Sequence, residues 1–565
     1  MEFITQNISS NYEVLLSGEN FSFSFLSILK GILGIAVLIF IAWMFSTNRK
    51  AISWNVVVKG LIIQLVIALS VMFFAPVQDF FNFFGSCFVA VLGWTKAGSE
   101  FLFGTFVDVS KFGFVFAFQI IPSIIFFAAF IGLLFYLGII QKVVWFFAVL
   151  MRKAMKLSGA ESLATVANIF VGQNEAPLIV KPYMAKMTKS EIMLIMVAGM
   201  STMAGGVLAA YVGMLGNQIS ELEIQFARHL LAASVMAAPA AVVISKILVP
   251  QTNEIETEAN ISKHKIGNNI LDAISNGAMD GVKLAVSVAA MLLVFYALIA
   301  GLNNIIAYFG NFTLLSLFSF CLSFSAAIYT YRFFRNINKD YSYRFLLIAS
   351  ILAALAVANI YLQKDNVPNM LPNPLFAVIA GVFFGAISGY ILLRRNKQKT
   401  INYYGISFAA LAVLFITLSI AFFSINENLN YIVADVTDGK YAQLSMQFIL
   451  GYAFAPVIWL IGVCPQDVSL VGELLGQKLI LTEFVGYNEL AKMLSSGAFF
   501  EIKSAIMAIY VLCGFANFAS VGIQVGGIGA IVPNQKSTLS AFGMRALLGG
   551  TLTALVSATI IGMML

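Results

Sequence analysis

Residues 167–178, with the sequence ANIFVGQNEAPL, decide the fold of this chain. A carboxylate, two adjacent amides, a glycine and a proline stand together there, and apolar sequence lies on both sides. A charged side chain at membrane depth costs about 2.5–3.5 kcal/mol on insertion scales, so it is rarely retained there without a function. Gly172 and Pro177 bracket the polar triplet and favour a break in the helix.

A break of this kind must line a cavity or be buried in protein, because broken backbone is not tolerated against lipid. We therefore expect a re-entrant helical hairpin over residues 161–184, with Gln173, Asn174 and Glu175 at its tip. The alternative is a cytoplasmic loop between two ordinary helices.

The composition of the whole chain indicates a polytopic membrane protein. Of its 565 residues, 60% are hydrophobic and only 10% are charged, whereas soluble domains carry about 25% charged residues. The length allows about a dozen spans of ~20 residues. The net charge of +7 does not predict a nucleic-acid partner, because the basic residues lie mostly in short loops, where they set topology.

The basic residues predict the orientation of the chain in the membrane, and the spacing of the cysteines argues against a disulfide or metal site. Arg49 and Lys50 follow the first predicted span, residues 25–45, so that end should be cytoplasmic and the N-terminus outside. Lysines after the hairpin, at positions 181, 186 and 189, indicate that it is entered from the cytoplasmic side. Four cysteines are scattered without pairing or metal spacing and are expected to be packing residues.

A span over residues 192–215 has an unusual centre, GMSTMAGG at positions 199–206. Small and hydroxyl residues permit close helix packing. They equally permit an unwound turn with free carbonyl groups, and the sequence leaves both interpretations open.

The second half of the chain repeats this pattern. GELLGQKL at 472–479 and LTEFVGY at 481–487 predict a second hairpin, entered from outside, and CGFANFASVG at 513–522 interrupts the apolar run that follows. Inverted repeats with broken helices are a recurrent architecture of secondary transporters. The predicted fold class is an all-α polytopic membrane protein with inverted repeats, two re-entrant hairpins and two broken helices.

Four further hydrophobic runs, at 314–329, 345–361, 375–393 and 406–423, separate the two halves. Their even number leaves the downstream orientation unchanged, and we interpret them as peripheral. The predicted organisation has four parts: 1–160, N-terminal scaffold; 161–306, first hairpin and broken helix; 307–442, inserted block; 443–565, second hairpin, broken helix and last span.

An enzyme is not expected. His229 and His264 are too far apart for a zinc-protease motif, and no phosphate-binding loop is present. Function must be argued from a site, and no catalytic site is visible. The polar breaks instead favour a carrier for a polar solute.

Several of these motifs together resemble the concentrative nucleoside transporter family. They are the first hairpin, GYAFAP at 451–456, TEFV at 482–485 and CGFANF at 513–518, and the likeness covers residues 25–306 and 445–565. The resemblance implies a homotrimer in which a scaffold surrounds a mobile transport domain that moves like an elevator. It also implies coupling to an ion gradient, usually Na⁺ and sometimes H⁺.

The resemblance also implies roles for particular side chains. Those expected to bind the nucleobase or pack near it are Gln173, Asn174, Glu175, Val207 and Phe515. Those expected to bind the ribose are Glu483, Asn517 and Ser520. A carboxylate can accept strong charge-assisted hydrogen bonds from ribose hydroxyls, and amides supply the paired donors and acceptors that a base edge requires. Asn174 stands where the family commonly has a small hydroxyl residue, which affects base preference.

The Na⁺ position of the family maps onto Asn168, the backbone of Val171, Thr202 and the backbone of Met203. Hard cations favour oxygen ligands, which these groups provide. Ser201, next to Thr202, is the alternative hydroxyl ligand, and Asn168 could instead stabilise the hairpin by bonding nearby backbone.

The sequence thus predicts Na⁺-coupled symport of nucleosides into the cell across a plasma (inner) membrane, with membrane lipid as surroundings and no cofactor beyond the coupling ion. The alternatives are a carrier of the same fold for a nucleobase or a nucleotide sugar, or H⁺-coupled nucleoside transport.

Overall fold

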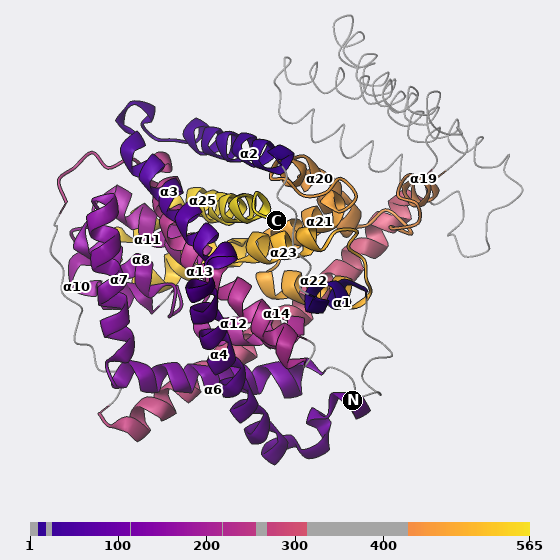
Figure 1. The fold of residues 1–565 in the computed structure, drawn as a ribbon, viewed down its shortest axis with the longest axis horizontal. Coiled ribbons are helices and arrows are strands. Elements are labelled where there is room, and N and C mark those ends of the chain that lie inside the picture. The colour runs from indigo at the N-terminus through magenta and orange to yellow at the C-terminus, as the bar shows by residue number, and fades with distance from the viewer. Residues whose placement is uncertain are drawn as a thin grey trace, which may run out of the picture. The chain divides into compact units, whose positions relative to one another are not determined.

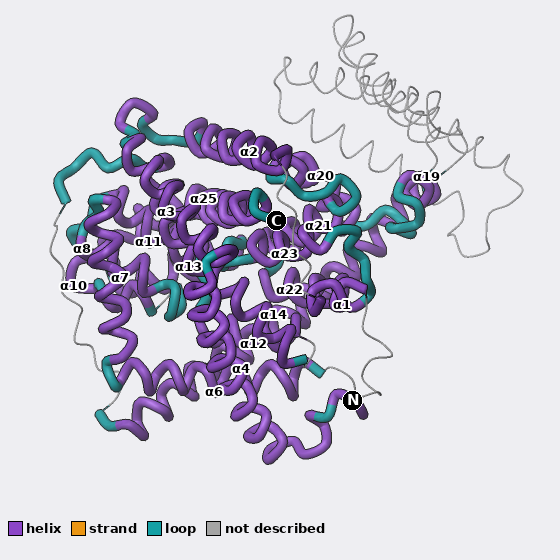
Figure 2. The backbone as a smooth tube through the Cα atoms, viewed as in Figure 1, coloured by secondary structure: helices purple, strands orange, loops and turns teal. Residues whose placement is uncertain are grey.

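The computed structural model describes residues 10–17, 25–112, 115–173, 175–216, 219–255, 268–312 and 428–565. Within these ranges the regular elements are helices (Figure 2). The four inserted runs and Asn174 lie outside the described residues. The chain divides into two compact units, residues 1–297 with 447–565 and residues 298–446.

Seven helices among the described residues are long and apolar enough to cross a membrane: α2, α3, α4 with the turn after it, α6, α13, α14 and α25. The helices outside the hairpins and broken helices are α1 (Ser10–Ser17), α2 (Phe25–Met44), α3 (Trp54–Phe73), α4 (Ala75–Phe103), α5 (Val109–Phe112), α6 (Phe116–Tyr136), α7 (Ile139–Met155), α13 (Ser220–Leu248), α14 (Ile270–Gly310), α19 (Leu429–Val436), α20 (Met446–Leu460) and α25 (Lys536–Gly562).

The first hairpin is present where the sequence predicts it. Its first arm is α8 (Gly159–Ala167), and its second arm consists of the two short helices α9 (Ala176–Ile179) and α10 (Lys181–Met184). The tip between them holds Gly172, and Pro177 stands in the first turn of α9. The helix therefore stops and restarts at the residues that disfavour continuous helix.

The span after the first hairpin is broken. Helix α11 (Lys189–Ser201) is followed by Thr202, which has extended backbone angles (φ −107°, ψ 164°), and α12 (Gly205–Gly216) begins three residues after Thr202. Between the two interpretations of the sequence, the unwound turn is the one observed. The amide of Gly205 donates to the carbonyl of Phe170 over 3.2 Å, which holds the hairpin tip against the break.

The second half has the same plan. Helices α21 (Val468–Ile480) and α22 (Glu483–Ser495) form the second hairpin, with a turn at Leu481 and Thr482. Helix α23 (Ile502–Leu512) and helix α24 (Phe518–Ile531) are separated by a break over residues 513–517. The prediction of a second hairpin followed by a second broken helix is confirmed.

Helices α13 and α25 lie in the middle of the larger unit, and most of each is buried within it (Figure 1). Helix α25 packs against α11, α13, α23 and α24, so it contacts both broken helices. The mostly apolar surfaces of α2, α3, α4 and α6 stay largely exposed, as expected for helices that face lipid.

The two helix breaks meet backbone to backbone. Gly514 has φ +83°, a conformation that favours glycine. A Cβ at this position would lie 2.4 Å from the carbonyl carbon of Ser201 at the end of α11. The absence of a side chain therefore allows the second break to touch the first, which brings the polar groups of both repeats into one region.

A buried ion pair ties the base of the first hairpin to its neighbours. Ser158 and Glu161 form a capping box that starts α8. The same Glu161 carboxylate accepts from the ammonium of Lys246 on α13 over 2.7 Å, and Lys246 also donates to Ser190 on α11 over 3.2 Å. Three elements of the larger unit are thus joined at one point.

The described part of the smaller unit is the end of α14 together with α19 and the residues around it. Asn428 caps α19 by accepting from the amide of Tyr431, and Asn430 donates to the carbonyl of Ala307 over 2.9 Å. These contacts attach α19 to the end of α14.

Candidate functional site

Glu483 is the most firmly held acidic side chain of the region. It stands at the first position of α22, and only 3% of its surface is exposed. One carboxylate oxygen accepts from the hydroxyl of Tyr211 over 3.1 Å, and the other accepts from the Nδ2 of Asn517 over 2.8 Å. Each oxygen keeps further lone-pair sites, so the fixed carboxylate can accept more hydrogen bonds.

Asn517 has two partners because of its place in the fold. It is the N-cap of α24, and its Oδ1 accepts from the backbone amide of Ser520 over 2.8 Å. Capping fixes the orientation of the amide, so its Nδ2 is directed at Glu483. The start of the second half of a broken helix therefore positions a carboxylate on the neighbouring hairpin.

Gln173 joins the first hairpin to this cluster. Its Nε2 lies 3.4 Å from the hydroxyl of Ser520, a long hydrogen bond, and its Oε1 accepts from the Nε2 of Gln524 over 3.0 Å. A chain of polar contacts thus runs from Gln173 through Ser520 and Asn517 to Glu483. Four of the predicted substrate-binding residues are brought together.

The remaining predicted residues lie differently. Val207 and Glu175 line a neighbouring cavity, and the carboxylate of Glu175 accepts from the backbone amide of Gly172. Phe515 is half-buried in the second break. Asn174 lies outside the described residues. The sequence grouped Glu175 with Gln173 at the tip, whereas Gln173 bonds inward to α24 and Glu175 lines the cavity.

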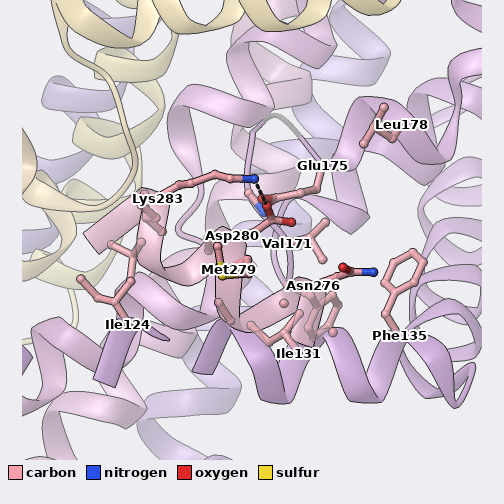
Figure 3. A pocket seen from close by; sticks show the side chains of 18 of the residues that line it. Ile124, Ile131, Phe135, Val171, Glu175, Leu178, Asn276, Met279, Asp280 and Lys283 are labelled. Atoms are coloured by element: carbon pink, nitrogen blue, oxygen red, sulfur yellow. Dashed lines mark hydrogen bonds and ion pairs between the residues drawn. The ribbon is translucent and has the colours of Figure 1, made fainter. Parts of the chain in front are cut away.

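This cavity has a volume of about 440 Å³ and lies between the first hairpin, α6, α12 and α14. Figure 3 shows Asp280 and Lys283 of α14 beside Glu175 in its wall. The two α14 side chains form an ion pair of 2.9 Å and are 69% and 72% exposed. The face of α14 toward the hairpin tip is therefore charged.

The predicted cation site has an acceptor without a partner. Asn168 is 1% exposed, its Nδ2 donates to the carbonyl of Ala164 over 3.0 Å, and its Oδ1 is buried with no hydrogen-bond partner. Buried acceptors are normally paired, so this oxygen is free to accept a ligand. Both uses of Asn168 that the sequence left open are compatible, because the nitrogen bonds the hairpin backbone while the oxygen stays available.

The two candidate hydroxyl ligands, Thr202 and Ser201, are both buried at the end of α11. Thr202 donates to the carbonyl of Ala198 over 2.9 Å, and Ser201 donates to that of Val197 over 2.5 Å. Each hydroxyl donates its hydrogen to a backbone carbonyl, so the lone pairs of its oxygen remain available. Oxygen lone pairs are the ligands that a hard cation prefers. Thr202 lies in the break itself with Met203, whereas Ser201 is still helical.

Sequence reasoning missed three polar residues of this region: Tyr211, Gln524 and Lys478. The ammonium of Lys478 is fully buried and donates to the carbonyls of Val511 and Cys513 over 3.0 and 2.7 Å, at the end of α23. A lysine inside an apolar hairpin was the available signal. Tyr211 and Gln524 stand within apolar helices, and nothing local marks them.

Taken together, two helical hairpins, two broken helices and a carboxylate fixed at the breaks define a secondary transporter, since inverted repeats with broken helices characterise that class. The chain belongs to the Na⁺-dependent nucleoside transporter family. The C-terminal domain of that family matches residues 229–363 and 394–562, its N-terminal domain matches 33–106, and a nucleoside-recognition gate domain matches 117–218.

Curated relatives agree with this assignment. An uncharacterized transporter of Haemophilus influenzae is 31% identical, with 95% of this chain and 98% of that protein covered. The nucleoside permease NupC of Helicobacter pylori is 28% identical, with 95% and 98% covered. Sodium/nucleoside cotransporter 1 of mouse is 29% identical over 94% of this chain, which spans 63% of that longer protein.

Solved structures confirm the fold. CNTnw in an inward-facing substrate-bound state is 28% identical with a TM-score of 0.67, and the alignment covers 95% of this chain and 99% of that one. A variant of CNTnw in an outward-facing state is 27% identical with a TM-score of 0.66, and the alignment covers 95% of this chain and 97% of that one. The chain is thus a multi-pass membrane transporter rather than an enzyme, and Na⁺ is the coupling ion of its family.

Proposed function

We propose that this protein is a Na⁺-coupled symporter that carries nucleosides into the cell across the plasma (inner) membrane. The observation that carries the proposal is the buried Glu483 carboxylate, oriented by Tyr211 and Asn517 at the junction of the two repeats. A preorganised carboxylate is suited to accept hydrogen bonds from two adjacent ribose hydroxyls. In this scheme Asn517 and Ser520 assist at the sugar, and Gln173, Asn174 and Glu175 read the base, with Val207 and Phe515 as apolar contacts.

The coupling ion binds at the first break in this scheme. Asn168, Thr202 and the backbone oxygens of Val171 and Met203 supply the ligands. The unpaired Oδ1 of Asn168 supports this placement. Because the Phe170 carbonyl already joins the hairpin tip to the start of α12, an ion there would stabilise the closed tip. Ion binding thereby favours the conformation that holds the nucleoside.

We further propose an elevator-like cycle within a homotrimer embedded in lipid, with the N-terminus outside. Both hairpin tips close over ion and nucleoside before the mobile domain moves. The inward- and outward-facing structures of CNTnw are consistent with two such end states in a related protein. Labelling of a single introduced cysteine near the N-terminus by a membrane-impermeant reagent in whole cells tests the orientation.

Uptake into proteoliposomes tests the main proposal. Labelled uridine or adenosine is added with an inward Na⁺ gradient, with K⁺ in place of Na⁺, and with a pH step. We expect concentrative uptake only with Na⁺. Uptake driven only by the pH step would move the coupling ion to H⁺. Competition by free bases but not by nucleosides would favour a nucleobase carrier, and no uptake of any nucleoside would end the assignment.

A further inference from the structure

Gln524 lies one helical turn beyond Ser520 on α24 and is fully buried. Its Nε2 donates to the Oε1 of Gln173 over 3.0 Å and to the backbone carbonyl of Met196, on α11, over 3.1 Å. Gln524 thus contacts the first hairpin and the first broken helix at once, although it is not among the residues proposed above to bind nucleoside or ion.

The carbonyl of Met196 determines which way both amides face. A backbone carbonyl only accepts hydrogen bonds, so the side of Gln524 toward Met196 must be its NH₂ group. The same NH₂ group faces Gln173, which must therefore present its oxygen to Gln524. The NH₂ group of Gln173 is then directed to the opposite side, toward Ser520. Ser520 accepts at most one of the two N–H donors of Gln173, over 3.4 Å, so at least one donor remains available to a ligand.

The surroundings are shaped for this pair of amides. A Cβ at position 199 would lie 2.7 Å from the Nε2 of Gln524 and 3.1 Å from the Cβ of Gln173, so Gly199 leaves the space that they occupy. The Oε1 of Gln524 is buried without a hydrogen-bond partner. An unpaired buried acceptor is costly, and an apolar side chain would avoid that cost. The amide is therefore better explained by its effect on Gln173 than by stability.

We propose that Gln524 is a positioning residue that sets base selectivity, by locking Gln173 as a hydrogen-bond donor toward the nucleobase. This inference rests on the proposed function. Uridine and cytidine exchange donor and acceptor at two adjacent positions of the base edge. A donor that cannot turn round distinguishes them when it faces N3 or the 4-substituent of the base, whereas an amide free to flip can serve either.

The test measures KM for uridine and for cytidine in proteoliposomes for the wild type and for Gln524→Met. One mismatched donor or acceptor changes affinity about fivefold to tenfold, so we expect the wild type to discriminate by that factor. In Gln524→Met, which is similar in size but has no donor, the two KM values should come within about twofold of each other.

Gly199→Ala provides a second variant, because its Cβ displaces the NH₂ group of Gln524 and crowds the Cβ of Gln173, so it should also abolish discrimination. Gly522→Ala on α24, where a Cβ meets no atom within 4 Å, is the matched control and should keep the wild-type ratio. If a variant is folded but too slow for uptake assays, the Kd ratio from nucleoside-induced thermal stabilisation gives the same readout.

A wild-type ratio within twofold overturns the inference, and so does an unchanged ratio in Gln524→Met or a folded Gln524→Met that binds neither nucleoside. In contrast, a wild type that transports no nucleoside at all would refute the proposed function itself. The two failures are therefore distinguishable.

Discussion

Tyr211 and Glu483 are 272 positions apart in the sequence, yet the Tyr211 hydroxyl donates to the Glu483 carboxylate over 3.1 Å. The tyrosine ring stacks on Tyr487, with ring centroids 4.1 Å apart, and meets Phe484 edge-on at 4.9 Å. A helix of the first repeat thus supplies one of the donors that orient the carboxylate of the second hairpin. The site is complete only when the two repeats are packed together.

Glu483→Gln should abolish or severely weaken transport while the protein stays folded. A neutral amide no longer offers a charge-assisted acceptor to the ribose, and one of the donors from Tyr211 and Asn517 would face an NH₂ group. Hydrogen bonds to charged groups contribute about 1.5–3 kcal/mol, so KM for nucleoside should rise about tenfold to more than a hundredfold. Uptake kinetics with size-exclusion profiles measure this.

Tyr211→Phe is the graded control for that substitution. It keeps the ring packed on Tyr487 and removes only one of the two donors to the carboxylate, so its effect on KM should be smaller. Transport by Glu483→Gln at the wild-type KM would remove Glu483 from the ribose site.

Asn168→Ala should weaken the binding of Na⁺ more than the binding of nucleoside. It removes the unpaired Oδ1 beside the helix break. If this oxygen contributes about as much to binding as one hydrogen bond to a charged group, the concentration of Na⁺ at half-maximal uptake should rise about tenfold or more. Thr202→Ala should also raise the Na⁺ concentration at half-maximal uptake. Ser201→Ala should have little effect if Thr202, which lies in the break, is the hydroxyl ligand. The same Na⁺ dependence in Asn168→Ala and the wild type would place the ion elsewhere.

The sequence predicted the hairpins and breaks because their determinants are local. Gly172, Pro177 and the charged residues interrupt apolar runs at the points where the helices stop. The partners of Gln173 could not be predicted in this way. Gln524 stands inside a regular apolar helix, and its contact with Gln173, 351 positions away, depends on how two broken helices pack.

The tip of the first hairpin shows the same limit. Sequence spacing puts Gln173 and Glu175 on one turn, but it does not give the direction of each side chain. The Glu175 carboxylate bonds back to the Gly172 amide and lines the cavity that faces α14, whereas Gln173 bonds to α24. Which wall each side chain joins is decided by backbone hydrogen bonding within the tip.

Gly514→Ala should destabilise the protein and stop transport. At φ +83° a Cβ is strained, and here it would also meet backbone atoms of Ser201 and Met200 within 2.5 Å, which cannot rotate away. Gly522→Ala, in the middle of α24 with open space around it, should leave transport unchanged. Thermal unfolding of the purified protein and uptake compare the two. A Gly514→Ala protein with wild-type Tm and uptake would show that the breaks need not touch.

Glu161→Gln should lower stability without changing which nucleosides are carried. It leaves the Lys246 ammonium buried against a neutral amide, and breaking a buried pair costs about 3–5 kcal/mol. Lys283→Gln is the matched control, because its pair with Asp280 is exposed and such pairs contribute about 0–1 kcal/mol. We therefore expect a marked fall in Tm only for Glu161→Gln.

The double substitution Glu161→Met with Lys246→Met should recover most of the loss, since replacing both charges by apolar groups removes the uncompensated ion. A double variant as unstable as Glu161→Gln would instead show that the capping box of α8, which Glu161 also forms with Ser158, is the larger contribution.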